Sequence, residues 1–85
     1  MPLHVEVVAP SEGLFSGDAD FVRLMTVEGD IGILPGHIPL LAQIAPCEIK
    51  VRTPQGDRLF PVAGGFITVK EDKVIILTEE VSAQS

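Results

Sequence analysis

The sequence contains a single cysteine, Cys47, so a disulfide within the chain is excluded. Neither Cys47 nor the two histidines, His4 and His37, have a spacing that resembles a zinc site, and we expect no metal ligand. No cation stands beside Cys47 to activate its thiol, which favours an inert side chain. One unpaired thiol is compatible with a reducing compartment, for which the cytoplasm is the default.

Positive charge is also scarce. Six Lys and Arg residues against twelve Asp and Glu residues give a formal net charge of -6, and the cations form no dense cluster. A phosphate backbone or an anionic membrane surface would be repelled, so we expect no nucleic-acid partner. A polar or basic protein surface remains a suitable partner.

Long hydrophobic runs and targeting signals are missing as well. The longest uncharged stretch, residues 31–47, is interrupted by prolines and a glycine and is shorter than the roughly 20 residues of a membrane span. The first ten residues lack a basic stretch and contain Glu6, which argues against a signal peptide. We therefore expect a soluble protein with no direct membrane insertion.

The sequence offers no matched set of catalytic groups. Nothing local orients either histidine; we interpret His4 as a solvated strand residue and His37 as a contact or structural residue of a loop. Gly64 and Gly65 are not followed by a phosphate-binding motif, and the acidic residues lack the regular spacing of a calcium loop. We expect no catalytic residue, no cofactor and no enzymatic activity.

The abundant signals are those of β-structure. Apolar residues make up 46% of the chain, and seven prolines and eight glycines punctuate short runs of β-branched residues. A chain of 85 residues has room for one domain. Alternation and turn residues predict an all-β sandwich with strands near residues 3–8, 14–15, 21–27, 40–45, 48–52, 58–63, 66–69 and 74–78.

Residues 28–39 are predicted to form a specified loop with embedded short strands, because its glycines permit unusual backbone angles and its prolines fix φ. The apolar residues Ile38, Leu40 and Leu41 lie at the end of this loop and directly after it. They either complete the core or wait for a partner, and the residues alone leave both readings open.

At this loop the sequence resembles a known family. Residues 28–41 read EGDIGILPGHIPLL, similar to the E-G-[ED]-[IL]-G-[IL]-x-P-G-H-x-P-L-[IL] signature of the F-type ATP synthase epsilon subunit, called delta in mitochondria. The LFSG at residues 14–17 and the AGGF at residues 63–66 resemble further family segments, so the resemblance covers nearly the whole chain.

The resemblance implies a ten-stranded β-sandwich and a non-catalytic rotor subunit of the central stalk. Residues 1–80 would form the N-terminal β-sandwich domain, and residues 81–85 a polar tail where the C-terminal helical domain of the family would begin. We expect that helical hairpin, its inhibitory action and its nucleotide binding to be absent.

The resemblance also implies two sets of contact residues. The set facing the gamma subunit comprises Ala9, Leu14, His37, Ile38, Pro39, Leu40 and Ala42. The set facing the polar loops of the c-ring comprises Glu28, Gly29, Asp30 and Ile31. The implied location is peripheral, on the cytoplasmic face of the bacterial inner membrane.

Two other readings stay open on the residues alone. One is a free-standing β-sandwich that serves as a protein-interaction module, which would have no affinity for a gamma subunit. The other is a small hydrolase or metal-dependent enzyme, which the scarcity of catalytic groups disfavours.

Overall fold

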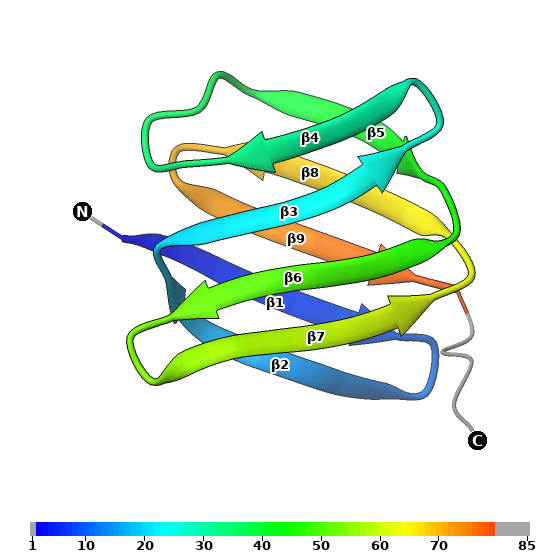
Figure 1. Ribbon diagram of the computed structural model, residues 1–85, viewed down its shortest axis with the longest axis horizontal. Helices are drawn as coiled ribbons and strands as arrows, with labels where there is room; N and C mark the ends of the chain where they lie inside the picture. Colours follow the sequence, from blue (N-terminus) through cyan, green and yellow to red (C-terminus); the bar gives the residue numbers. More distant parts are fainter. Residues whose placement is uncertain (1, 80–85) are drawn as a thin grey trace.

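The computed structural model describes residues 2–79, which form nine strands and contain no helix (Figure 1). The resemblance implied ten strands. Residues 80–85, and with them the predicted polar tail, lie outside the described part of the chain. The strands are β1 (Leu3–Ala9), β2 (Glu12–Ala19), β3 (Phe21–Thr26), β4 (Gly29–Ile33), β5 (Leu40–Ile44), β6 (Cys47–Thr53), β7 (Gly56–Val62), β8 (Gly65–Lys70) and β9 (Lys73–Thr78).

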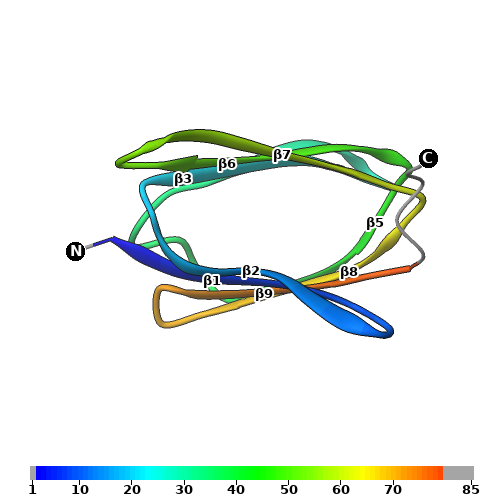
Figure 2. The same ribbon diagram turned by 90° about the horizontal axis from the view of Figure 1, so that it is seen from below.

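The strands form two layers that face each other, which confirms the predicted all-β sandwich (Figure 2). The first layer has the strand order β2-β1-β9-β8-β5, and the second consists of β4, β3, β6 and β7. Strand β5 joins the layers, since Ile44 pairs with Thr26 of β3. Two further backbone bonds strengthen this joint: the amide of Val27 donates to the Gln43 carbonyl at 3.0 Å, and that of Ala45 donates to the Met25 carbonyl at 2.9 Å.

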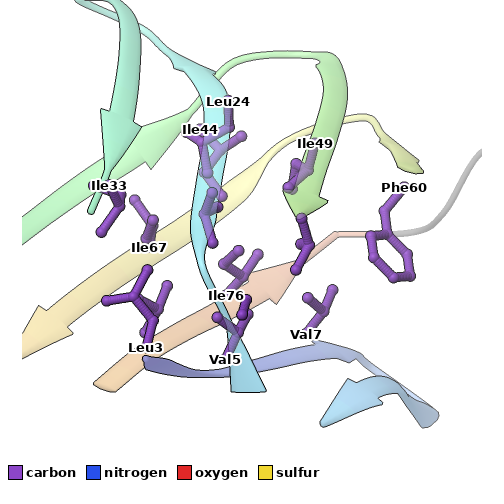
Figure 3. Close-up of a cluster of buried hydrophobic side chains, with 14 of the residues drawn as sticks. Leu3, Val5, Val7, Leu24, Ile33, Ile44, Ile49, Phe60, Ile67 and Ile76 are labelled. Carbon is purple, nitrogen blue, oxygen red and sulfur yellow. The ribbon is translucent and has the colours of Figure 1, made fainter. Parts of the chain in front are cut away.

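The core lies between the layers and follows the alternation of the sequence. Leu3, Val5 and Val7 of β1 are fully buried and point toward Leu24 and Ile49 of the second layer (Figure 3). Burying a side chain of this size stabilises the fold by about 1.5–3 kcal/mol before entropy is counted. Val22, Leu24, Ile49 and Val51, which alternate with exposed or half-buried residues along β3 and β6, are buried as well.

One predicted segment differs from the structure. The short strand predicted at residues 14–15 is part of the eight-residue strand β2, because Ser16 and Gly17 continue the ladder with β1 opposite Glu6 and Val5. Residues 29–33 form the regular strand β4, paired throughout with β3, which agrees with the embedded short strands predicted for residues 28–39. Pairing with a neighbouring strand therefore overrides the low β-propensity of glycine and serine in both segments.

Strand β7 pairs only with β6 among the described strands, so it is an edge strand. Its Pro61 is therefore tolerated, because it lies opposite Glu48 at a non-hydrogen-bonded position of the ladder, where the missing N–H faces away from β6. Across the seam between β7 and β2, the Arg58 guanidinium lies 5.4 Å from the Phe15 ring centre and 5.7 Å from that of Phe60. Arg58 therefore covers the open side of the sandwich with contacts to both layers.

Gly65 opens β8 at a point of close backbone approach. Its φ is +146°, and a Cβ placed there would lie 2.1 Å from the Leu77 carbonyl oxygen and 2.9 Å from Thr78 Cα. Glycine is required because both the backbone angle and the space exclude a side chain.

We predict that Gly65→Ala lowers the free energy of unfolding by at least about 3 kcal/mol, since the β8–β9 ladder would have to open. Urea unfolding followed by circular dichroism measures this change. Gly13→Ala is the matched control, because nothing lies within 4 Å of a Cβ at Gly13. Equal stability of the two variants would contradict the assigned role of Gly65.

Candidate protein-contact surfaces

The loop between β4 and β5, residues 34–39, is held by a tight turn. Pro35 and Gly36 occupy its two central positions, Gly36 has a φ of +86°, and the His37 amide donates to the Leu34 carbonyl at 3.1 Å. This is the pattern of a type II turn, which favours proline followed by glycine. The sequence motif therefore fixes the path by which the chain reaches Ile38.

The loop presents its apolar side chain to solvent. Ile38 is 74% exposed, and Pro39 is also exposed. His37 is half-buried, and its Nδ1 lies 2.6 Å from the Ile38 carbonyl oxygen, which accepts a hydrogen bond when that nitrogen carries the proton. Of the predicted gamma-facing set, the three loop residues thus form one accessible projection.

The other predicted gamma-facing residues are placed differently. Ala9 is buried, and Leu14, Leu40 and Ala42 are half-buried and pack against the core. Ala9 and Leu14 lie on β1 and β2, separated from β5 by β9 and β8. The structure therefore does not bring the seven residues together into a single patch. Their contact with gamma stays a prediction.

An exposed apolar surface that the sequence analysis missed covers the outer face of the first layer. We call it the apolar stripe: Leu41 of β5, Phe66 of β8 and Leu77 of β9, which are 74%, 50% and 52% exposed. Phe66 pairs with Leu77, and Leu41 lies one diagonal position away, opposite Thr68. Successive side chains of a strand point to opposite faces, so the inward positions of Ile67 and Val69 could have placed Phe66 on the outer face.

The second predicted surface is the β3–β4 hairpin, whose turn residues are Val27 and Glu28. The Thr26 hydroxyl donates to the Gly29 carbonyl at 2.8 Å and accepts from the Glu28 amide at 3.1 Å. Since the Val27 amide also donates to Gln43 of β5, the hairpin tip is fixed to its neighbour. A depression of about 300 Å³ lies between them, lined by residues 26–28 and 40–43.

Glu28, Gly29 and Asp30 are exposed at this hairpin, whereas Ile31 is half-buried and packs on the core. Asp30 already has a partner within the chain, because Nε of Arg23 donates a hydrogen bond to Asp30 Oδ2 at 3.1 Å. Nη2 of Arg23 donates to the same oxygen. Hydrogen bonding from Arg23 lowers the pKa of Asp30, and the same bond raises the pKa of Arg23. The acid expected to meet the ring is therefore one half of an exposed ion pair.

Within residues 2–79, no cluster of three or more histidine, cysteine, aspartate or glutamate side chains is arranged to hold a metal ion. The same residues include no helix that could cross a membrane. His4 is half-exposed on β1, with Nε2 3.3 Å from Glu6 Oε2 and Nδ1 3.7 Å from Asp18 Oδ1. Cys47 is half-buried, and its Sγ lies 3.8 Å from the Met25 carbonyl.

Comparisons with known proteins agree on one family. The model of the ATP synthase delta/epsilon chain β-sandwich domain matches residues 2–84. The ATP synthase epsilon chain of Frankia casuarinae is 45% identical over 80 residues, which cover 93% of this chain and 94% of that relative. The epsilon chain of Halalkalibacterium halodurans is 44% identical over 77 residues and is covered to 58%, so this chain spans little more than half of that relative.

A solved structure shows the same fold. A chain in the Euglena gracilis mitochondrial ATP synthase, determined as OSCP/F1/c-ring in rotational state 1, superimposes with a TM-score of 0.87 at 26% identity. The superposition covers 95% of this chain and 52% of the Euglena chain.

The fold is a small two-layered β-sandwich domain with large apolar side chains exposed on its surface. The chain belongs to the ATP synthase delta/epsilon family, as its motif indicated, and this family supplies a non-catalytic rotor subunit of the F-type ATP synthase. Its relatives are subunits of a membrane-associated complex.

We predict that Asp30→Asn lowers the melting temperature at pH 7 by no more than a few degrees, because the pair with Arg23 is exposed. The lowered pKa of Asp30 means that the stabilisation is present above the ordinary aspartate pKa of about 3.9 and is lost as the pH falls through the folded-state value. Thermal melts of both chains between pH 7 and pH 2 measure this difference.

Glu28→Gln is the control, since Glu28 has no ion pair within the part of the chain that the structure describes. A gap between wild type and Asp30→Asn that stayed constant down to pH 2 would show that the ion pair is not its source.

Proposed function

We propose that this chain couples rotation to ion flow by binding two partners at once, the gamma subunit and the polar loops of the c-ring. It would lie at the foot of the central stalk, on the cytoplasmic face of a bacterial inner membrane. Proton or sodium-ion flow would turn the ring, and the sandwich would pass that rotation to gamma without chemistry of its own.

The observation that carries the gamma contact is the exposure of large apolar side chains beside a complete core. Ile38 and Leu41 are each 74% exposed although the space between the layers is already filled. Adjacent exposed apolar residues on a small domain are typical of an interface that a partner covers. Ile38 together with the apolar stripe supplies the anchors that a gamma surface would desolvate.

The inward-facing members of the predicted gamma set support this surface from beneath. Leu40 and Ala42 alternate with Leu41 along β5 and pack against the core. We propose that they set the height and orientation of Leu41, while His37, Ile38 and Pro39 contact gamma directly.

The c-ring contact is assigned to the β3–β4 hairpin. Its tip exposes the Glu28 carboxylate beside the exposed Gly29, where a polar loop can approach the backbone closely. The Thr26 bonds fix the turn, so little ordering entropy would be lost on contact. Asp30 would take part as a member of the Arg23 pair, offering both charges to the basic and amide groups of the ring loops.

The domain boundary near residue 80 is also part of this proposal. Strand β9 ends at Thr78, and the Glu79 amide donates to the Gly64 carbonyl at 2.9 Å, which closes the sandwich at this end. Residues 1–80 would therefore be the rotor-binding unit.

We predict that Ile38→Asp and Phe66→Asp each weaken gamma binding at least tenfold, because a charge would have to be desolvated in an apolar interface. Titration of the labelled chain against purified gamma subunit measures the affinity, and circular dichroism checks the fold. Leu59→Asp is the matched control, since Leu59 is 53% exposed on β7 of the other layer. Equal losses in all three variants would refute this location of the interface.

We predict that Glu28→Lys lowers ATP synthesis driven by an ion gradient about two- to fivefold in a reconstituted complex, with gamma affinity unchanged, because the charge at the hairpin tip is reversed. Asp30→Lys should lower it further, since the Arg23 pair is lost as well. Synthesis at the wild-type rate in both variants would remove the hairpin from the ring contact.

A further inference from the structure

The β8–β9 turn holds the gamma-facing loop through one side chain, Asp72. Its Oδ1 accepts a hydrogen bond of 2.7 Å from the Gly36 amide, 36 residues earlier in the chain. Gly36 is the second central residue of the turn that leads to Ile38. Pro35 and Pro39 have no amide hydrogen, and the His37 amide is used inside the turn, so Gly36 is well placed to bond outside the loop.

Asp72 is itself fixed in an unusual conformation. The two central residues of its turn, Glu71 and Asp72, have φ values of +52° and +63°, although neither is glycine. Two-residue hairpins favour such angles, but a residue with a Cβ adopts them at a cost in backbone energy that glycine does not have. The Asp72 carbonyl also accepts a 2.9 Å bond from the His4 amide, which ties the turn to β1.

If the hairpin turn were the only constraint on position 72, glycine or asparagine would suit it better than aspartate. Glycine would remove the backbone cost but also the oxygen that Gly36 requires. Asparagine tolerates positive φ and keeps an acceptor. The side-chain acceptor oxygen at position 72 is therefore explained by the loop that it holds and not by the hairpin to which it belongs.

We propose that Asp72 is a positioning residue for gamma docking, which rests on the proposed function of the loop. Its carboxylate keeps residues 34–39 in the conformation that presents Ile38, so the binding-competent state is populated before gamma arrives. Loss of the bond lowers that population, and the apparent affinity falls by the same fraction.

The kinetic signature separates this role from a direct contact. A residue that only preorganises the loop changes the association rate, because fewer encounters meet a competent loop. A residue that touches gamma changes chiefly the dissociation rate. Association and dissociation are therefore measured separately for each variant.

The test compares Asp72→Gly, Asp72→Asn and Glu71→Gly in the full chain. Amide hydrogen exchange at Gly36 reports the tether without gamma, and surface plasmon resonance against immobilised gamma subunit reports docking. In Asp72→Gly we expect faster Gly36 exchange and association slowed about three- to tenfold with dissociation unchanged. Asp72→Asn should keep both near wild type. Glu71→Gly, which relieves the same kind of backbone cost but leaves the acceptor in place, should do so as well.

Unchanged Gly36 exchange in Asp72→Gly would overturn the tether. Faster exchange with normal association, or a loss seen in dissociation instead, would overturn the positioning role while the gamma contact itself stands. Failure of the wild-type chain to bind gamma would contradict the proposed function, and with it any role of Asp72 in docking, although the exchange result would still report on the tether alone.

Discussion

The arrangement of both proposed surfaces depends on strand β5, which hydrogen-bonds to both layers of the sandwich. It pairs with β8 from Leu40 to Ile44 and joins β3 through Ile44, next to the bond between Val27 and Gln43. The gamma-facing loop enters β5, and the ring-facing hairpin rests against it. Moving one surface relative to the other would therefore break backbone bonds beside a close-packed core, which makes the connection stiff.

Much of this fold was predictable because most strands alternate clearly. In β1 the polar His4 and Glu6 separate Leu3, Val5 and Val7, and in β6 Lys50 separates Ile49 and Val51, so the buried face of both strands follows directly from the sequence. Pro61 marked an edge strand because a central strand has no place for a residue without an N–H. The prolines and glycines of residues 28–41 located the loop, since their backbone restrictions are local and need no knowledge of the partner strand.

The contact surface could not be predicted in the same way, because it arises from pairing between distant strands. Leu40, Leu41 and Ala42 are all apolar, so the first three residues of β5 show no alternation, and Gln43 alone indicates which side chains face the core. The structure places Leu41 outside and the other two inside. Phe66 joins Leu41 only because β8 pairs with β5, and Gly36 meets Asp72 only because the same pairing sets Leu40 opposite Val69, which brings the loop before β5 to the turn after β8. Neither relation leaves a local signal.

The two surfaces differ in chemistry, and that difference suits a rotor part. The surface proposed to face gamma is apolar, so its binding energy would come from burial and would be insensitive to salt. The hairpin proposed to face the ring would rely on the exposed charges of Glu28 and the Asp30–Arg23 pair, whose interactions are screened beyond about 8 Å at physiological ionic strength. On the proposed assignment the sandwich would therefore stay bound to gamma, while its contact with the ring would be the weaker and more adjustable of the two. Because β5 connects the surfaces rigidly, torque could pass through the weaker contact without loosening the stronger one.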